Sequence, residues 1–417
     1  MKKSGSEFLS DLKLFYPYLR KGLVIQKLNF IKKFEEFNEC YNQVLLQNEK
    51  DETAIKVAKT LVKGIEEGFI TESDLDELLF LLIEDTLFNS YLFKLQKENI
   101  EFNNDKDLNE LLIKWGVPTD NQILSNVRNN SDKDFVICGY RRYDFDSIRL
   151  LLLDKKPVKI YSQDEEDLYA AYPTLIDIDY RRNLLHIRIK DVDLIESNSK
   201  EVSTFKGRIE NTLNFLYQLE PKIYCKEIEN VRRSLFLIEE NLLKNQREKA
   251  QQMLVGFELQ IDEFVNNIYQ KFGAVEEEGI TSKDHISTAV LSIISKNLKR
   301  NEQGDIVGIK FRNKHGEGKE NYAEVSIIEK DYKCISTDEL YWINLSVLLN
   351  QKEIEFLKIG KFFNAGFVIF NLTVSLNTLN VRLMQRSSHP DNELERQPND
   401  QKYEEVIEFI NNFLSEH

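Results

Sequence analysis

Asp177 and Asp179 are the two residues whose types and spacing come closest to a catalytic metal site. They lie in the β-prone run Leu175–Tyr180, and residues two apart on a strand face the same side of a sheet. Metal-dependent nucleases hold Mg²⁺ between two such carboxylates, while the lysine of a Glu-x-Lys sequence orients the attacking water. Here His186-Ile187-Arg188 follows where Glu-x-Lys would be required. Because a third ligand and the lysine are missing, Asp177 and Asp179 are only weak catalytic candidates.

No other sequence pattern indicates an enzyme. Asp305 followed by Glu317-Gly318-Lys319 repeats the letters of the nuclease pattern, but Glu317 lies in a glycine-containing loop and not on an apolar strand. The chain lacks a G-x-x-x-x-G-K-[ST] phosphate loop, a G-x-S-x-G elbow and an H-E-x-x-H pair. The histidines are scattered, and His186 is expected on the solvent face of its strand. The sequence therefore predicts no cofactor and no metal.

A basic helix and hairpin at residues 281–330 is the strongest candidate for binding an anionic partner. Residues 281–390 hold 15 Lys and Arg against 12 Asp and Glu, within a chain whose net charge is −14. Thr281 and Asp284 begin an amphipathic helix, and two β-prone runs follow it. In a winged-helix protein such a helix enters the major groove while cations of the hairpin reach phosphate. The predicted nucleic-acid contacts are Lys299, Arg300, Lys310, Arg312, Lys314, His315 and Lys319. The alternative is a solvated hairpin with ordinary surface charge.

A second basic set combines arginine with tyrosine, in Tyr140-Arg141-Arg142-Tyr143 and Tyr180-Arg181-Arg182. Arginine suits bidentate contact with phosphate, and tyrosine suits stacking on bases. Aspartates stand close to both sequences, so ion pairing within the chain is the favoured interpretation of Arg141, Arg142, Arg181 and Arg182.

The alternation of helical and β-prone segments predicts an α+β multidomain protein. Residues 1–116 are expected to form a helical domain, because apolar residues recur there at helical spacing. Residues 134–200 are expected to form an α+β unit in which short β-prone runs alternate with helical pieces at Ser147–Leu153 and Glu165–Ala171. The first half of the chain thus has a helical part followed by a sheet.

The second half repeats this pattern with longer helices. Residues 201–280 carry an apolar stripe that fits one long helix or a helical hairpin. Where the stripe thins, at residues 244–249, the segment is expected either to bridge through solvent or to break. Residues 281–390 are expected to form the basic, winged-helix-like α+β unit, and residues 391–417 an acidic tail with a terminal helix. The two α+β units are therefore small and separated by a long helical segment.

Capping boxes mark two further helix starts. Thr71 with Asp74, and Ser336 with Glu339, place a hydroxyl three residues ahead of a carboxylate. Each pair can satisfy free amides in the first turn of a helix. Helices are expected to begin directly after Thr71 and Ser336.

One short match indicates an internal duplication. Leu185–Ile189 and Leu379–Leu383 both read L-x-[IV]-R-[IL], and each is expected to be the second arm of a hairpin at the end of an α+β block. Duplication would make the two sheets related. Alternating β-branched residues also produce five-residue matches by chance, so both interpretations stay open.

Composition places the chain among globular proteins of the cytoplasm. At 417 residues, 41% hydrophobic and 30% charged, it is expected to form about two or three domains. Its four cysteines form no C-x-x-C pair, which argues against a disulfide framework or a zinc knuckle, and Cys138 is expected to be a buried apolar residue. Neither a signal peptide nor a membrane-spanning run is recognised. Heavy use of Lys, Asn, Ile and Glu is associated with bacterial genomes.

These observations favour a non-enzymatic bacterial subunit that acts through protein contacts. Long amphipathic helices, 26 Phe and 17 Tyr without a catalytic signature are typical of a chain that binds other subunits or its own copies. Nucleic-acid binding by residues 281–330 is a further expectation, and an accessory role in phage defence or DNA processing would fit it. The alternatives are a metal-dependent nuclease and a purely structural oligomeric scaffold.

Overall fold

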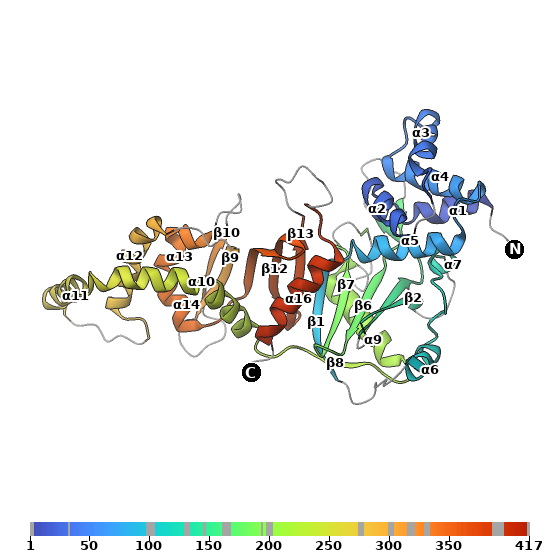
Figure 1. Cartoon of the computed structure of the whole chain (residues 1–417). Helices are drawn as coiled ribbons and strands as arrows, with labels where there is room; N and C mark the ends of the chain where they lie inside the picture. Colours follow the sequence, from blue (N-terminus) through green and yellow to red (C-terminus); the bar gives the residue numbers. More distant parts are fainter. Residues whose placement is uncertain are drawn as a thin grey trace. The chain divides into compact units, whose positions relative to one another are not determined.

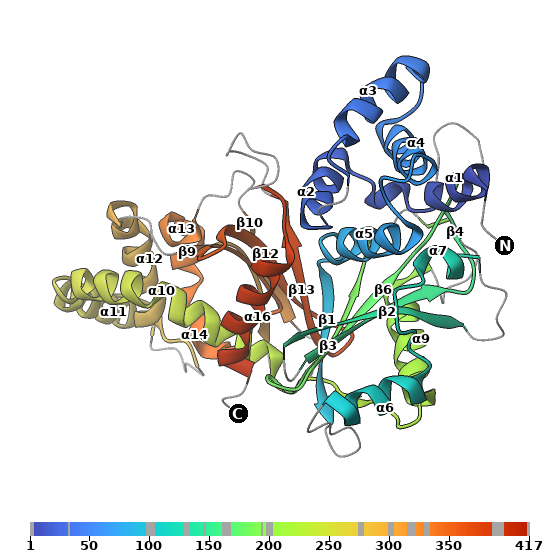
Figure 2. The same cartoon turned by 45° about the vertical axis from the view of Figure 1, so that its right-hand side comes forward.

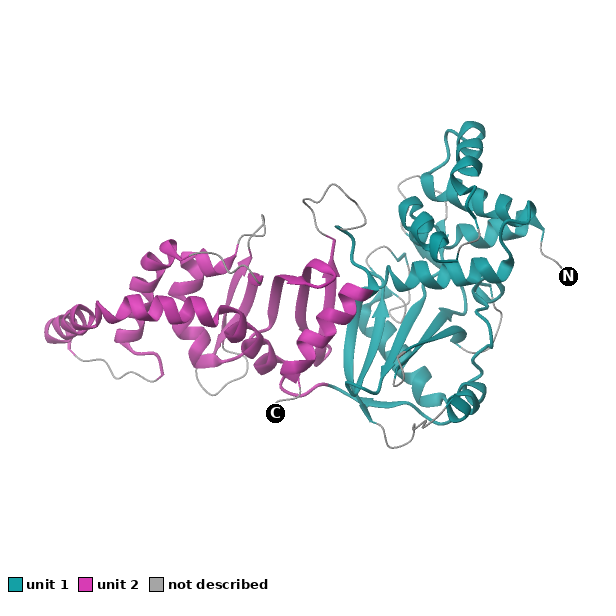
Figure 3. Cartoon of the chain, viewed as in Figure 1, with its two compact units in different colours: residues 1–227, 390–400 teal, residues 228–389, 401–417 magenta. Residues whose placement is uncertain are grey.

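The computed structural model describes residues 4–31, 34–96, 105–128, 134–144, 147–160, 168–192, 195–196, 203–273, 279–298, 304–314, 322–328, 334–385 and 396–414. The chain divides into two compact units (Figure 3). Unit 1 comprises residues 1–227 and 390–400, and unit 2 comprises residues 228–389 and 401–417. Each unit combines helices with an antiparallel sheet, so the predicted α+β multidomain fold is confirmed.

Unit 1 begins with helices and continues with strands (Figure 1). Its helical elements are α1 (Gly5–Lys13), η1 (Tyr16–Tyr18), α2 (Lys21–Ile31), α3 (Phe37–Gln47), α4 (Thr53–Glu66), α5 (Glu72–Glu84), α6 (Asp105–Trp115), α7 (Ile123–Asn126) and α9 (Phe205–Gln218). Its strands are β1 (Asn89–Gln96), β2 (Phe135–Asp144), β3 (Ser147–Asp154), β4 (Val158–Ile160), β5 (Leu168–Ala170), β6 (Thr174–Asp179), β7 (Leu184–Ile189) and β8 (Tyr224–Lys226). β1 lies within the range that was expected to be entirely helical.

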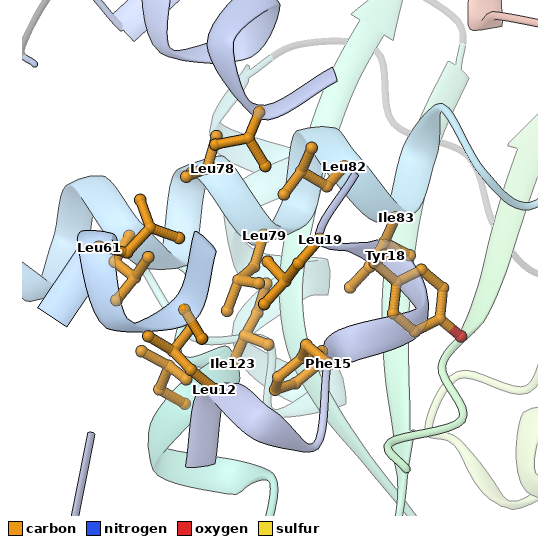
Figure 4. Close-up of a cluster of buried hydrophobic side chains, with 14 of the residues drawn as sticks. Leu12, Phe15, Tyr18, Leu19, Leu61, Leu78, Leu79, Leu82, Ile83 and Ile123 are labelled. Carbon is orange, nitrogen blue, oxygen red and sulfur yellow. The ribbon is translucent and has the colours of Figure 1, made fainter. Parts of the chain in front are cut away.

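The N-terminal helices pack around an apolar core that reaches onto the sheet (Figure 4). The capping box predicted at Thr71 is present: the Asp74 carboxylate accepts from the Thr71 amide at 2.9 Å, and the Thr71 hydroxyl accepts from the Asp74 amide at 3.2 Å. α5 therefore begins where the sequence predicts, and it buries most of its length. Core side chains include Leu12, Phe15, Leu61, Leu78, Leu79 and Ile123 from the helices, and Cys138, Leu151, Leu153 and Leu175 from the strands.

The main sheet of unit 1 has the strand order β1-β7-β6-β3-β2, and β8 pairs with β1. Arg149 on β3 is directly opposite Asp177 on β6, which is directly opposite His186 on β7. Directly opposed residues share a face of an antiparallel sheet. Arg149 pairs with Glu84 of α5, so this row lies on the face toward α5. Figures 1 and 2 show α9 on the other side of the sheet. The sheet thus brings three polar side chains together beneath a helix.

Two helices predicted in this part are wrong. Ser147–Leu153 belongs to β3, whose residues up to Leu153 are all buried, and of Glu165–Ala171 the described residues contain β5. Leucine has a high helix propensity, which favours a helix for the run Leu150–Leu153. Strand pairing on both sides of β3 overrides that propensity, because the buried backbone amides and carbonyls need partners.

Unit 2 holds the longest helices. Its helical elements are α10 (Val231–Val255), α11 (Glu258–Phe272), α12 (Ser282–Ile294), η3 (Ser295–Asn297), η4 (Ile335–Thr337), α13 (Glu339–Ile343), α14 (Leu345–Gln351) and α16 (Asp400–Leu414, of which residue 400 belongs to unit 1). Its strands are β9 (Gly304–Lys314), β10 (Tyr322–Ile328), β11 (Phe356–Phe363), β12 (Gly366–Ser375) and β13 (Thr378–Met384). They form an antiparallel sheet in the order β10-β9-β11-β12-β13.

The hairpin expected to be a wing is the edge of this sheet. β9 pairs with β10 on one side and with β11 on the other. α12 begins at the predicted capping box of Thr281 and Asp284 and packs against α10, α11 and α13. A free two-stranded wing is therefore not formed, because β11 supplies a third strand from later in the sequence.

Of the two interpretations left open for residues 244–249, the break is wrong. α10 runs without interruption through residues 244–249, and the break comes at Gly256 and Phe257, after which α11 begins. Glycine favours such a position because it costs helix stability in an interior. The second capping prediction is also wrong: Asp338 caps α13 by accepting from the Leu340 amide at 2.7 Å, while the Ser336 hydroxyl donates to Asp305 at 2.5 Å.

The terminal helix and the two matched hairpins are present. α16 extends over Asp400–Leu414, and in unit 2 its Val406, Ile407 and Ile410 are buried. The two L-x-[IV]-R-[IL] sequences lie on β7 and β13, each the second arm of a hairpin. The residues two positions before each match, Asn183 and Asn377, both have positive φ, at 60° and 58°. The two loops differ in length, with four residues between Asp179 and Leu184 and two between Ser375 and Thr378, so only the left-handed asparagine is shared and duplication stays a prediction.

Candidate protein-interaction surface

Asp177 is held by two arginines and is completely buried. Arg149 donates from Nε to Oδ1 at 2.5 Å and from Nη2 to Oδ2 at 3.0 Å, and Arg188 donates from Nη1 to Oδ2 at 3.2 Å. Burial acts to raise the pKa of Asp177, but the two guanidinium groups outweigh it and hold this pKa well below its ordinary value. The carboxylate is therefore an ionised member of an ion-pair network.

Glu84 and Asp400 complete that network within unit 1. Arg149 Nη1 pairs with both carboxylates, at 2.9 Å to Asp400, and Arg188 Nη1 pairs with Asp400 at 2.9 Å. Arg188 also donates to the main-chain carbonyls of Leu87 at 2.8 Å and Glu84 at 2.7 Å. Two buried arginines and three carboxylates thus tie β3, β6 and β7 to the end of α5 and to residue 400. Such a network holds elements in register and presents no reactive group to solvent.

Asp179 and His186 lie beside the ion-pair network and are buried in the sheet. Asp179 accepts from the Ser147 hydroxyl at 3.2 Å and pairs with Arg182 at 2.6 Å. His186 is fully buried, so its predicted place on the solvent face is wrong. Burial lowers the pKa of His186 to about 4, although Asp177 and Asp179 act to raise it. Within the described part of the chain, no group of three His, Cys, Asp or Glu side chains is arranged to hold a metal ion.

The arginines of the second basic set pair with carboxylates from several elements of unit 1. Arg141 pairs with Glu77 at 2.6 Å and with Glu84 at 3.4 Å, and Arg142 pairs with Asp105. Arg182 pairs with Asp179, and Arg181 is exposed. At least three of the four arginines therefore lie in ion pairs. Their charge is largely compensated within unit 1.

The positive charges of the basic hairpin also lie close to carboxylates. Lys310 lies 3.9 Å from Glu324, Arg312 lies 3.4 Å from Glu355 and over the Tyr322 ring, and Lys314 lies 2.5 Å from Glu353. Each of these three predicted contacts has a glutamate within 4 Å, but Glu355 also pairs with Arg232 at 2.7 Å, so the positive charge is compensated in part. The other four predicted contacts, Lys299, Arg300, His315 and Lys319, lie outside the described residues.

Exposed apolar side chains gather instead at the end of α10 and along α11. Of twenty exposed large apolar side chains among the described residues, six lie between residues 253 and 272, with 43% to 79% of their surface exposed. We call these six the α11 surface: Met253, Val255, Phe257, Leu259, Phe264 and Phe272. Figures 1 and 2 both show α11 at the end of unit 2 that lies away from the strands of that unit.

Helix geometry explains why this surface is uncovered. Ile261 and Val265 are buried, and α11 packs against α12, to which a 2.7 Å pair between Asp262 and Lys283 also joins it. Successive residues of a helix are about 100° apart, so Phe257 and Phe264 fall on the same apolar stripe as Ile261, along its other edge. α12 covers only one edge of the stripe. The sequence identified this stripe and indicated a chain that binds other proteins, but it did not show which half of the stripe is exposed, because periodicity does not show how wide a face the neighbouring helix covers.

Comparisons with known proteins identify no relative. No protein-family model matches the chain, and neither a curated protein nor a solved structure is similar to it. None of the described helices is long and apolar enough to cross a membrane.

Proposed function

We propose that this protein is a non-enzymatic subunit that binds another protein through the α11 surface, in the bacterial cytoplasm. The observation that carries the proposal is the exposure of Phe257 and Phe264 along one edge of the apolar stripe of α11, with the exposed Phe272 further along the same stripe. Single exposed apolar side chains are normal, whereas a cluster of them marks an interaction site. A role in phage defence or DNA processing belongs to the same proposal.

Aromatic anchors would supply most of the binding energy. Interface hot spots are rich in aromatic side chains that become fully desolvated on binding. Fully burying a phenylalanine contributes about 1.5–3 kcal/mol, and Phe257, Phe264 and Phe272 still have 47%, 53% and 79% of their surface to bury, so together they would contribute about 3–5 kcal/mol before the cost of association. The rest of the interface must offset that cost, so the three rings act as anchors within a larger contact.

The partner is expected to be a different protein with a net positive charge. The chain carries a net charge of −14, and strong like charge disfavours the association of two copies. A basic partner would be attracted by the same charge, which raises the association rate at low salt. The partner would present an apolar helix or groove to the aromatic side chains of α11.

Ion pairing argues against the two competing functions. Phosphate binding by the hairpin requires available cations, but Lys310, Arg312 and Lys314 have glutamate neighbours. A nuclease requires carboxylates open to Mg²⁺, but Asp177 is buried between Arg149 and Arg188. Binding another protein through the α11 surface requires neither available cations nor open carboxylates.

The experiment uses the full chain, with Phe257→Ser and Phe264→Ser combined in one variant. The control combines Phe30→Ser and Leu46→Ser, which change side chains of unit 1 that are 70% and 77% exposed. Each tagged protein is incubated with an extract of its source cells, and the captured protein is identified, purified and titrated against the chain. We expect one partner that binds the unchanged chain and the control equally and the α11 variant at least about tenfold more weakly.

Light scattering after size-exclusion chromatography completes the test. We expect a monomer at micromolar concentration, because the partner is a different protein. A dimer that the α11 variant abolishes would overturn the choice of partner. Equal binding of the purified partner to both variants, or its absence from the extract, would overturn the proposed function.

A further inference from the structure

Lys155 and Lys156 separate two hollows on the surface of unit 1. One hollow encloses about 360 Å³ and is also lined by Arg208 and Asn211 of α9 and by Asp134. The other encloses about 400 Å³ and is also lined by Arg128 and Tyr169. Because both lysines line both hollows, a single ligand could contact them from either side.

The turn between β3 and β4 fixes these lysines in place. β3 ends at Asp154 and β4 begins at Val158, so only Lys155, Lys156 and Pro157 connect them. The Lys155 amide donates to the Asp134 carbonyl at 3.0 Å, which ties the turn to the start of β2. The ring of Pro157 restricts the backbone further. The two ammonium groups therefore extend from a constrained three-residue turn.

Lys155 and Lys156 have no carboxylate partner within the described part of the chain. In the basic hairpin, by contrast, Lys310, Arg312 and Lys314 lie beside glutamates. An ammonium without a counterion has all three of its donors available to a ligand. The positive charge of this turn is therefore not compensated locally.

Arg208 adds a buried cation to the first hollow. It is 2% exposed, its Nη2 donates to both Asp154 oxygens at 3.0 Å and to the Tyr172 carbonyl at 3.1 Å, and its guanidinium lies 3.9 Å from the centre of the Tyr172 ring. Its Nε is buried and has no acceptor among the described residues. Three contacts on one nitrogen hold the group rigidly, and donor capacity remains on the others.

The charges around the two hollows favour an anion. Four cations (Arg128, Lys155, Lys156 and Arg208) and two carboxylates (Asp134 and Asp154) line them, which gives 4 − 2 = +2 on a chain of net charge −14. Asp154 already pairs with Arg208, and Arg128 donates to Asp11 at 2.9 Å. The two lysines supply the excess.

We propose that the two hollows bind a small phosphate ester that carries a planar ring, of the nucleotide class. The phosphate lies between Lys155, Lys156 and Arg208, because charge-assisted hydrogen bonds to phosphate are among the strongest that a protein makes. The ring stacks on Tyr169, whose side chain is 46% exposed at the second hollow. This site lies in unit 1 and does not depend on partner binding through the α11 surface.

Calorimetric titration of the full chain with AMP, ribose 5-phosphate and inorganic phosphate tests the proposal. We expect saturable binding of AMP, weaker binding of ribose 5-phosphate, and the weakest binding of phosphate. Lys155→Ala combined with Lys156→Ala is expected to weaken AMP binding by about tenfold or more, because two charge-assisted contacts are lost. Tyr169→Ala is expected to reduce AMP affinity to that of ribose 5-phosphate.

A matched control combines Lys106→Ala with Lys206→Ala, whose side chains are 84% and 68% exposed in surface pairs. We expect this control to bind AMP as the unchanged chain does. No saturable binding of any of the three probes, or equal loss in the control and the turn variant, would overturn the site. Equal affinity of the unchanged chain for AMP and ribose 5-phosphate would overturn the assignment of the ring to Tyr169.

Discussion

Asp177 and Arg149 face each other across β6 and β3 and form a two-point ion pair in which neither side chain has any exposed surface. Taking two such charges out of water is expensive, and the cost is offset only when hydrogen bonds satisfy both groups. Arg188 and Glu84 provide these additional bonds. The pair therefore joins strands of unit 1 to α5. Because neither side chain is exposed, the pair is poorly placed to bind a substrate or a metal ion.

Removing the carboxylate of Asp177 should strongly destabilise unit 1. Asp177→Asn leaves Arg149 and Arg188 buried with less compensating charge, and breaking a buried pair in this way costs about 3–5 kcal/mol. Urea unfolding followed by circular dichroism measures the change. The control is Asp120→Asn at an exposed position, which should change the free energy of unfolding by less than about 0.5 kcal/mol. A loss below about 1 kcal/mol for Asp177→Asn would contradict the structural role.

His186 should make the protein less stable as the pH falls from about 6.5 to about 4. Burial lowers its pKa from 6.5 to about 4 in the folded chain, so the unfolded chain binds a proton in this window that the folded chain does not. The free energy of unfolding should therefore fall with decreasing pH, by about 3 kcal/mol over the whole window. Asp177, whose folded pKa is depressed, loses its contribution only at lower pH.

Comparison with His186→Gln isolates this effect. Burial raises the pKa of Glu84, which acts in the opposite direction at acidic pH, so the wild-type curve alone mixes several groups. Unfolding free energies of both proteins are measured at several pH values, and their difference should narrow or reverse as the pH falls from neutral to 4. Parallel curves would show that His186 does not titrate as its burial requires.

Ile261 of α11 and Phe257, which directly precedes this helix, should respond differently to truncation. Ile261 is 3% exposed and packs within the chain, so Ile261→Ala should lower the free energy of unfolding by about 2–5 kcal/mol. Phe257 is 47% exposed, and Phe257→Ala should cost less than about 1 kcal/mol. Chemical denaturation of both variants measures this. A large cost at Phe257 would mean that its ring serves folding, which would weaken its assignment to the α11 surface.

The described cations of the hairpin should contribute little to nucleic-acid affinity. Lys310→Ala, Arg312→Ala and Lys314→Ala are combined, and a mobility-shift titration with duplex DNA is run at two salt concentrations. Because each cation lies beside a glutamate, the triple variant should bind within about twofold of the unchanged chain and with the same salt dependence. A marked loss that grows at low salt would restore the predicted phosphate contacts.

The left-handed turns before β7 and β13 should tolerate glycine and reject valine. Asn183 and Asn377 have φ of 60° and 58°, a conformation that asparagine adopts readily and β-branched residues do not. Asn183→Val and Asn377→Val should each cost about 1–2 kcal/mol, while Asn183→Gly and Asn377→Gly should be close to neutral. Thermal unfolding of the four variants measures the difference. Equal effects of valine and glycine would show that neither turn constrains its hairpin.

The sequence by itself determined the features that depend on neighbours along the chain. The capping boxes at Thr71 and Thr281 set the starts of α5 and α12, since both partners of each box lie within one turn. The apolar run around Cys138 was correctly predicted to be buried. Alternation within Leu184–Ile189 and Thr378–Met384 was sufficient to find β7 and β13. In each case the physical cause acts over a few residues.

Only the tertiary structure decided which side chains meet. Arg149 and Asp177 are 28 residues apart, and Arg149 and Glu84 are 65 apart, so no local pattern shows that their charges cancel in the interior. The leucines of β3 prefer a helix until β2 and β6 supply backbone partners on both sides. Likewise, the stripe on α11 is evident in the sequence, but the half that stays exposed follows from where α12 packs. Pairing and burial are set by contacts between distant segments, and these exist only once the chain has folded.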